Sequence, residues 1–277
     1  MIARRLDAEL VARGLARSRG QARELVDGGA VLVDGQPAAK PALPVGPDTA
    51  ILLTRPPEKW VGRAALKLLH ALQTWPIGVE GRRCLDVGAS TGGFTQVLLE
   101  HGAAHVTALD VGHDQLAAEV AADPRVTDLP GTNVRDVDAA ALGGAFDLVV
   151  ADLSFISLTV VLPPMRALVR EDGDLVVLVK PQFEVGRERL SRTGVVTSVH
   201  ERRRVLKEVV AAAAALGLRL HGAAASPIAG ADGNREFLLW LRPAAATGVG
   251  EVVGPSPGAT ASDPDDMLGA IDLEGDQ

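Results

Sequence analysis

The spacing of apolar residues at the start of the chain predicts two short helices. Leucines recur every four or five residues from Leu6 to Leu15, and Gly14 interrupts this helical pattern. Ser18 has a side chain suited to capping a second helix, which should end at the glycine pair that begins at Gly28.

A strand pattern follows the helices. Residues 30–33 and 36–38 are strand-forming segments that flank Asp34-Gly35, a pair typical of a tight hairpin turn. Residues 49–53 predict a last strand, and the prolines of residues 55–60 indicate a stiff linker. We therefore expect a small domain with both helices and strands before the linker.

Beyond the linker, short apolar segments alternate with helical ones. A helix expected over residues 61–74 carries Leu66, Leu69 and Leu72 on one side. Strands are expected at residues 84–87, 105–111, 146–151, 174–180, 218–226 and 236–241, with a further strand before Asn133. This alternation is typical of an α/β domain in which helices cover both faces of a mostly parallel, seven-stranded sheet.

These patterns divide the chain into four segments. From residue 244 the sequence is rich in Gly, Pro, Ala and Asp and has no periodicity, which is typical of disorder. We therefore expect a small α+β domain (residues 1–54), a linker (55–60), the α/β domain (61–243) and an acidic disordered tail (244–277).

The formal net charge of −7 is unevenly distributed. Residues 1–67 contain 11 Lys and Arg against 7 Asp and Glu, a net charge of +4, whereas residues 244–277 contain 7 acidic and no basic residues. The acidity therefore lies in the tail, and the N-terminal part keeps a basic surface suited to RNA.

The composition argues against several classes of protein. Aromatic residues make up 3% of the chain and Tyr is absent, which argues against RNA binding mainly by base stacking. The one cysteine, Cys84, can form no internal disulfide, as expected in a reducing cytoplasm. No apolar run approaches the roughly 20 residues that span a bilayer, and the N-terminus lacks the apolar core of a signal peptide. We therefore expect a cytoplasmic protein that does not bind membranes.

Polar features follow the first three strands of the α/β domain. The first strand leads into the glycine-rich turn of residues 86–94, where a ligand can approach the backbone. Asp110 ends the second strand and is placed to accept hydrogen bonds from ribose hydroxyls. Asn133 and Asp136 follow the third strand, where an acidic side chain can bind an adenine amino group. The turn alone would also fit a dinucleotide site or a merely tight turn, but it lacks the G-x-G-x-x-G spacing of NAD sites.

Together these residues resemble the cofactor site of class I (Rossmann-like) S-adenosylmethionine (SAM) methyltransferases. The resemblance implies that SAM is the cofactor, and no metal is expected. It implies the following cofactor-binding residues: Asp86, Gly88, Ala89, Ser90, Gly92, Gly93, Phe94, Asp110, Asn133 and Asp136.

The later strands carry candidate catalytic residues. The fourth strand ends in Asp152-Leu-Ser-Phe and not in the Asn/Asp-Pro-Pro-aromatic motif of amino-group methyltransferases, and the fifth ends in Lys180. With Lys67 and Glu236, these residues resemble the Lys-Asp-Lys-Glu tetrad of FtsJ-like ribose 2′-O-methyltransferases. The resemblance implies that Lys180 activates the 2′-oxygen and that Asp152 orients Lys180 and the methyl group. Lys67 and Glu236 would complete the charge network.

The chemistry of a ribose hydroxyl explains why such a tetrad is needed. The hydroxyl must lose its proton as it attacks, and a lysine can assist only if a neighbouring cation or burial lowers its pKa. Each residue also has a structural interpretation: Lys67 as a solvated helix lysine, Asp152 as a helix cap, and Glu236 as a partner of Arg235. Their order and their positions at strand ends favour the catalytic interpretation.

The N-terminal segment resembles the S4-type RNA-binding domain, which has two helices followed by a hairpin, here Gly29 to Gly35. Its arginines imply phosphate contacts, which give affinity but little base specificity, although they could also form a solvated helix face. The loop of residues 183–196 is expected to close over RNA, although it could be an ordinary solvated connection. The candidate RNA-binding residues are Arg4, Arg5, Arg13, Arg17, Arg19, Arg23, Arg63, Arg187, Arg189 and Arg192.

The order of the modules resembles that of the TlyA family over residues 1–243. The family's usual Ser-Arg-Gly-Gly/Ala-x-Lys segment differs here at Ala64, while Arg63 and Lys67 match. The family implies 2′-O-methylation of cytidine in 16S and 23S ribosomal RNA, with RNA or ribosomal subunits as partners; some members are described as hemolysins. The alternatives are a catalytically silent ribosome assembly factor, a membrane-active hemolysin and a small-molecule methyltransferase. No dimerisation stripe is evident, so a monomer is expected.

Overall fold

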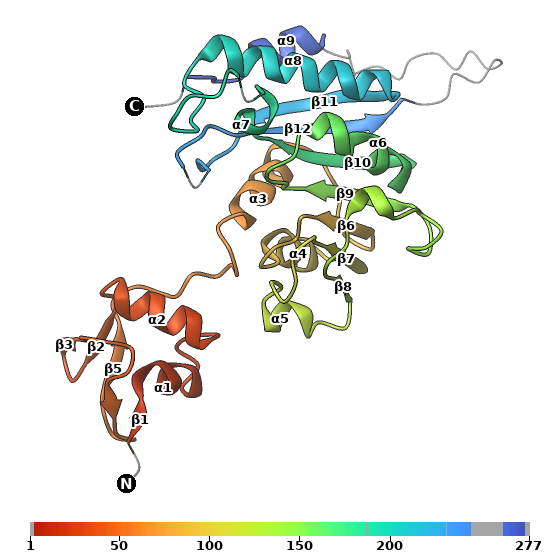
Figure 1. Ribbon diagram of the computed structural model, residues 1–277. Coiled ribbons are helices and arrows are strands. Elements are labelled where there is room, and N and C mark those ends of the chain that lie inside the picture. Colours follow the sequence, from red (N-terminus) through yellow and green to blue (C-terminus); the bar gives the residue numbers. More distant parts are fainter. Residues whose placement is uncertain (1–2, 187, 231, 245–262, 275–277) are drawn as a thin grey trace. The chain divides into compact units, whose positions relative to one another are not determined.

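The structure, a computed structural model, describes residues 3–186, 188–230, 232–244 and 263–274 (Figure 1). The chain forms two compact units, Met1–Lys59 and Trp60–Gln277. Most of the expected linker therefore belongs to the first unit.

The first unit packs two helices against a small sheet. Its elements are β1 (Arg4–Arg5), α1 (Leu6–Ala12), α2 (Arg19–Asp27), β2 (Val31–Val33), β3 (Gln36–Pro37), β4 (Pro44–Val45) and β5 (Ile51–Leu53). Strand β2 pairs antiparallel with β3 and β5, and β1 pairs with β4. Ser18 caps α2 as expected, because its side chain accepts a hydrogen bond from the backbone N–H of Gln21. The β1–β4 ladder was not expected, since strands of two residues leave no periodic pattern.

The second unit is built on a seven-stranded sheet, which confirms the expected class of fold. Its strands are β6 (Arg83–Val87), β7 (His105–Leu109), β8 (Val126–Leu129), β9 (Phe146–Ala151), β10 (Val169–Val179), β11 (Leu218–Ala225) and β12 (Phe237–Pro243). The strand order is β11-β12-β10-β9-β6-β7-β8. The two pairs that include β12 are antiparallel and the other pairs are parallel. The last strand in sequence therefore lies between β10 and β11.

Helices cover both faces of this sheet (Figure 1). They are α3 (Ala65–Thr74), α4 (Gly93–Glu100), α5 (Ala118–Ala121), the 3-10 turn η1 (Val134–Asp136), α6 (Leu158–Leu168), α7 (Pro181–Glu184), α8 (Val199–Ala215) and α9 (Pro264–Gly269). Helices α3 and α4 share one core with Val150, and α6 and α8 share the other with Val149. Adjacent strand residues point to opposite faces, so each buried strand serves both cores.

Helix α3 differs from the expectation in its start and in its buried side. It begins at Ala65 and not at residue 61. Its buried side carries Ala65, Leu68 and Ala71, whereas Leu66 is 38% exposed. The two alanines have small side chains that allow the helix axis to approach the sheet, a feature that a pattern of leucines does not detect.

The C-terminal segment also differs from the expectation. Residues 263–274 form α9 and a short extension. Leu268 of α9 and Ile271 and Leu273 of the extension are buried in the core beside α8 and β11. The expectation of a disordered tail is wrong for these residues, because three apolar side chains find a partner surface that composition alone does not reveal. Residues 245–262 and 275–277 of that tail lie outside the described residues.

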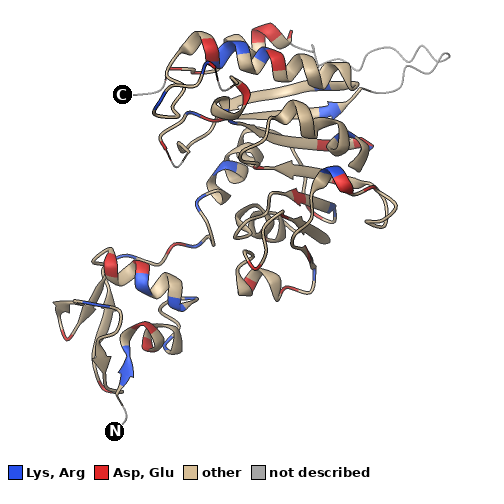
Figure 2. Cartoon of the chain, viewed as in Figure 1, with Lys and Arg blue, Asp and Glu red and all other residues tan. Residues whose placement is uncertain are grey.

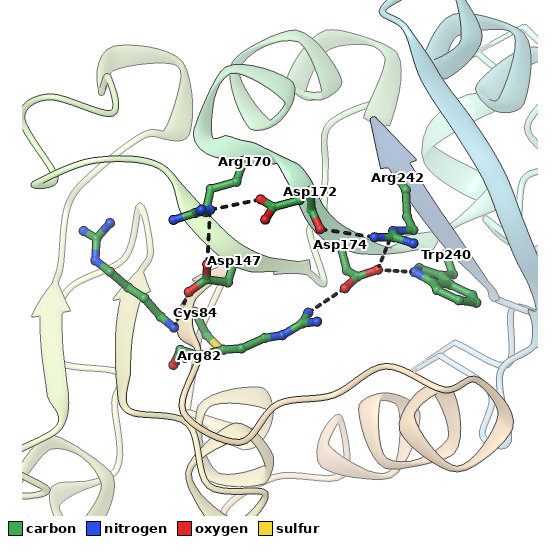
Figure 3. A network of polar contacts seen from close by, with 9 residues as sticks. Arg82, Cys84, Asp147, Arg170, Asp172, Asp174, Trp240 and Arg242 are labelled. Carbon is green, nitrogen blue, oxygen red and sulfur yellow. Dashed lines mark hydrogen bonds and ion pairs between the residues drawn. The ribbon is translucent and has the colours of Figure 1, made fainter. Parts of the chain in front are cut away.

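A network of charged residues links three strands of this sheet, at the strand ends opposite to those that carry Asp152 and Lys180 (Figure 3). Asp174, at 3% exposure, accepts hydrogen bonds from Arg82 (2.5 Å) and from the indole N–H of Trp240 (2.8 Å). The guanidinium of Arg242 forms an ion pair with the same carboxylate at 3.2 Å. Since these partners come from β10, β12 and the start of β6, the network ties the antiparallel strand to the parallel part of the sheet.

Candidate active site

The four expected catalytic side chains meet at one edge of the sheet. Asp152 follows β9 and Lys180 follows β10, Glu236 precedes the antiparallel β12, and Lys67 lies in α3. The Lys67 ammonium lies 2.9 Å from Asp152 Oδ2 and 2.7 Å from Glu236 Oε2. The Lys180 ammonium lies 2.6 Å from Asp152 Oδ1. The two lysines and two carboxylates therefore form one chain of ion pairs.

The burial of this cluster sets its electrostatics. Side-chain exposure is 8% for Lys67, 11% for Asp152, 10% for Lys180 and 3% for Glu236. Burial alone would lower the pKa of Lys67, but the carboxylates of Asp152 and Glu236 outweigh it and raise that pKa above its ordinary value. Lys67 is therefore a permanent cation, so the lowered lysine pKa that the chemistry calls for is not a property of this residue.

Two cavities adjoin the cluster. The first, of about 530 Å³, is lined by all four cluster residues and by Arg63, and the second, of about 450 Å³, includes Asp110 and Asn133. Five residues line both cavities: Gly88, Ser90, Asp152, Ser154 and Phe155. A molecule in either cavity would therefore meet its neighbour beside Asp152.

Most of the residues expected to bind the cofactor line these cavities. The residues with this placement are Gly88, Ala89, Ser90, Gly93, Phe94, Asp110 and Asn133. Gly92 lines neither cavity; at its φ of +91° an added Cβ would lie 2.7 Å from Leu116 Cδ1, so the residue serves packing. Asp136 is exposed at the end of η1 and also lines neither cavity. Residue order places Asp136 after the third parallel strand but does not determine which way its side chain points.

Two aspartates lie at the glycine-rich turn of residues 86–94 and are held by hydrogen bonds. Asp110 accepts hydrogen bonds from the backbone N–H groups of Ser90 and Gly112, both at 2.8 Å. Asp86 is fully buried and accepts a hydrogen bond from Thr95 Oγ1 at 2.7 Å. Burial, with smaller contributions from the nearby carboxylates of Asp152 and Asp110, raises the pKa of Asp86 to about 7 against the hydrogen bonds from Thr95.

The sequence patterns missed two residues at the junction of the cavities. Phe155 has a φ of +65° and is 91% exposed, and its ring lies 5.2 Å from the ring of Phe183. Ser154 accepts a hydrogen bond from the Lys180 ammonium at 2.8 Å. The chain has five phenylalanines, and Phe155 follows the end of β9 by four residues, which offered a signal for it. Nothing in the sequence distinguished Ser154.

The arginines of the first unit are held by contacts within that unit. Arg5, Arg19 and Arg23 reach the buried carboxylate of Asp7 at 2.9, 3.1 and 3.5 Å, and each stays about half exposed. Hydrogen bonds from Arg5 and Arg19 outweigh burial and hold the pKa of Asp7 far below its ordinary value. Arg13 donates to the carbonyl of Thr49 at 2.7 Å, so it also supports the fold. Basic residues of β1 and α2 are visible in Figure 2.

The remaining candidate arginines differ in their placement. Arg17 donates to the carbonyl of Glu58, and Arg4 forms an exposed ion pair with Glu9. Arg189 forms an exposed ion pair with Glu201 at 3.4 Å, and Arg192 is exposed. Arg187 lies outside the described residues.

Two other kinds of feature are absent from the part of the chain that the structure describes. Within it, no group of three His, Cys, Asp or Glu side chains could hold a metal ion. A search of the same residues finds no helix long and apolar enough to cross a membrane.

The sheet, its crossover helices and the Lys-Asp-Lys-Glu cluster define a class I methyltransferase of the FtsJ-like type. The family model for FtsJ-like methyltransferases matches residues 60–243, and the S4 domain model matches residues 4–51. A Mycobacterium tuberculosis protein named 16S/23S rRNA (cytidine-2′-O)-methyltransferase TlyA is 54% identical over 86% of this chain and 89% of its own length. The chain therefore belongs to the TlyA family.

Two further relatives agree with this assignment. A Campylobacter jejuni protein named 23S rRNA (cytidine-2′-O)-methyltransferase TlyA is 32% identical over 83% of this chain and 96% of its own length. A solved structure from Streptococcus thermophilus, described as a hemolysin, covers 97% of this chain and 95% of its own, with a TM-score of 0.69 and 33% identity. Proteins named as hemolysins and as methyltransferases therefore share this chain's architecture.

Proposed function

We propose that this chain methylates the ribose 2′-hydroxyl of a cytidine in ribosomal RNA, with SAM as the methyl donor. The observation that carries the proposal is the Lys180 ammonium, held against Asp152 in the wall of a cavity that adjoins the candidate cofactor cavity. The names of the relatives supply the nucleotide and the RNA class.

The chemistry of the second cavity fits SAM. Leu109, Val134 and Ile156 offer apolar walls for an adenine ring, and Asp110 offers a carboxylate for the ribose hydroxyls. Asp86 lines neither cavity, so its part in the site is to support the turn from within the core. When bound, SAM supplies a methyl group that is already activated by a sulfonium. The protein therefore has to bind, align and deprotonate the acceptor.

The cluster divides these tasks. A neutral Lys180 can accept the proton of the 2′-hydroxyl, while Asp152 holds its nitrogen in place. Lys67 forms ion pairs with Asp152 and Glu236, which offsets part of the cost of burying the two carboxylates. Alignment of the hydroxyl with the methyl group then supplies much of the rate acceleration.

The aromatic residue at the junction suits a nucleotide substrate. Phe155 presents a nearly fully exposed ring between the two cavities. A base turned out of its stack gains stacking energy on such a ring, which favours single-stranded or looped RNA. Arg63 lines the same cavity and can pair with a phosphate.

The first unit would add affinity through its arginines. Arg5, Arg19 and Arg23 keep half of their surface free while Asp7 fixes their orientation, an arrangement suited to phosphates. Arg4, Arg189 and Arg192 are exposed and can contribute further contacts. We place the reaction in the cytoplasm with ribosomal subunits, and we expect a monomer.

The test is methyl transfer from labelled SAM to unmethylated small and large ribosomal subunits, with nucleotide mapping, for the wild type and Lys180→Ala. A ribose 2′-O-methyl mark in the wild type that the variant loses supports the proposal. SAM binding by both proteins without a mark would refute it and favour an RNA-binding assembly factor. Lysis of protein-free lipid vesicles by the pure protein would favour a membrane-active hemolysin.

A further inference from the structure

We infer that Ser154 is a positioning residue, which aims the proton-accepting site of Lys180 at the substrate cavity. The inference rests on the proposed function, since it concerns the same proton transfer. It starts from the Lys180 nitrogen, which forms an ion pair with Asp152 Oδ1 at 2.6 Å and donates a hydrogen bond to Ser154 Oγ at 2.8 Å. Among the described residues, Ser154 is its one hydrogen-bond acceptor, because Asp152 Oδ1 lies outside hydrogen-bond geometry.

The tetrahedral geometry of an amine gives these two contacts a consequence. The nitrogen of lysine carries three positions besides its bond to Cε. In the neutral form two of them are N–H donors and the third is the lone pair. Ser154 takes one of the two donors, which restricts rotation about the last bond of the side chain, and the charge of Asp152 attracts the other donor. The lone pair is then left at the remaining position.

The cavity that Lys180 lines indicates where that position is open. Asp152 and Ser154 lie in the wall shared by both cavities, whereas Lys180 lines only the first, larger cavity. A position of its nitrogen that neither Asp152 nor Ser154 occupies is therefore open to the cavity that would hold the ribose. The 2′-hydroxyl can then pass its proton to this lone pair, which yields an ammonium and a 2′-oxygen ready to accept the methyl group.

Asp152 alone would not fix the direction of the lone pair. With that ion pair as its single contact, the nitrogen could rotate about the last bond of the side chain, and the lone pair would point in many directions. The backbone two residues before Ser154 is fixed. The carbonyl of Asp152 packs against Gly88, where an added Cβ would lie 2.9 Å from that oxygen. The backbone N–H of Asp152 also donates to the carbonyl of Val87 at 3.2 Å, so the segment that carries Ser154 is anchored to the end of β6.

The experiment compares Ser154→Ala with Ser154→Thr, which keeps the hydroxyl. Loss of alignment should lower kcat of the alanine variant by about 10- to 100-fold. KM for the ribosomal substrate and Kd for SAM should stay within about twofold, and the threonine variant should stay close to the wild type. A second readout needs no RNA. It is 15N relaxation of the lysine ammonium groups, with the Lys180 signal assigned through Lys180→Arg. The order parameter of the Lys180 nitrogen should fall in the alanine variant only.

Several results would overturn the inference. Unchanged kcat in the alanine variant would do so, and so would a rise in KM alone, which would make Ser154 an RNA contact. Equal order of the Lys180 nitrogen in the alanine variant and the wild type would also overturn it. A wild type that leaves ribosomal RNA unmarked would refute the proposed function instead, while the relaxation data would still decide the role of Ser154.

Discussion

Replacement of Lys67 by methionine tests whether this cation holds the active site together. Methionine keeps most of the length and apolar surface of the side chain but removes the charge. It would leave Asp152 and Glu236, at 2.9 and 2.7 Å from the lost nitrogen, without their shared partner. Removing one partner of a buried ion pair costs about 3–5 kcal/mol, because the other charge remains buried. The low exposure of Glu236, at 3%, makes this cluster a buried one.

The assay is urea unfolding followed by tryptophan fluorescence. All three tryptophans, at positions 60, 75 and 240, belong to the second unit, so the signal reports on that unit alone. We expect Lys67→Met to lower its free energy of unfolding by about 3–5 kcal/mol at neutral pH, with loss of methyl transfer. The difference should shrink as the pH falls, because protons then neutralise the carboxylates that are left behind.

The matched control is the double variant Lys67→Met with Glu236→Gln. Glutamine has nearly the same shape as glutamate but carries no charge, so the double variant should recover a large part of the lost stability. A single variant within about 1 kcal/mol of the wild type would refute the reasoning, since so small a loss is typical of surface ion pairs. A double variant less stable than the single one would refute it equally, because it would show that Glu236 does not depend on Lys67.

Three further changes test other parts of the structure. Phe155→Ala should weaken turnover on ribosomal RNA by about 5- to 150-fold, since base stacking on an aromatic ring is worth about 1–3 kcal/mol. Its SAM affinity should not change, and calorimetry would reveal a change that contradicts this role. The raised pKa of Asp86, about 7, means that the folded protein keeps a proton that the unfolded chain releases near pH 4. Stability without cofactor should therefore fall as the pH rises from about 4 to 7 and stay low above it, and Asp86→Asn should flatten this dependence in thermal unfolding; an unchanged slope would contradict the assignment. Leu268→Asp places a charge at a site that is 1% exposed and should detach the C-terminal segment, measured as faster proteolysis of residues 263–274. Equal proteolysis of variant and wild type would show that α9 does not depend on this contact.

The sequence was sufficient to predict the main features of the fold, for identifiable reasons. Parallel strands buried on both faces are short continuous apolar runs, and they alternate with longer helical segments, so the α/β sheet could be recognised. Three members of the tetrad stand next to strand ends, and such ends gather at one edge of a sheet. This is why Asp152, Lys180 and Glu236 could be grouped with Lys67 before any distance was known.

Other features depend on contacts that periodicity does not contain. The burial of Leu268, Ile271 and Leu273 requires a surface formed by α8 and β11, so a short apolar segment in an acidic tail gave no sign of it. The left-handed backbone of Phe155, which leaves its ring exposed, belongs to a turn whose shape is set by packing. Asp136 shows the opposite error, because a position after the right strand does not by itself bring a side chain into a cavity.

The place of β12 in the sheet sets the order in which the protein becomes competent during its own synthesis. This strand is made last among the seven, yet it lies between β10 and β11. Glu236 precedes one end of it, beside Lys67, and the other end carries Trp240 and Arg242, the partners of Asp174. A nascent chain whose residue 242 has not yet emerged from the ribosome therefore has an open sheet. Asp174 then has only Arg82 of its three partners at one end, and the catalytic cluster is unfinished at the other. A protein proposed to modify ribosomes can thus acquire its activity only after a ribosome has made and released β12.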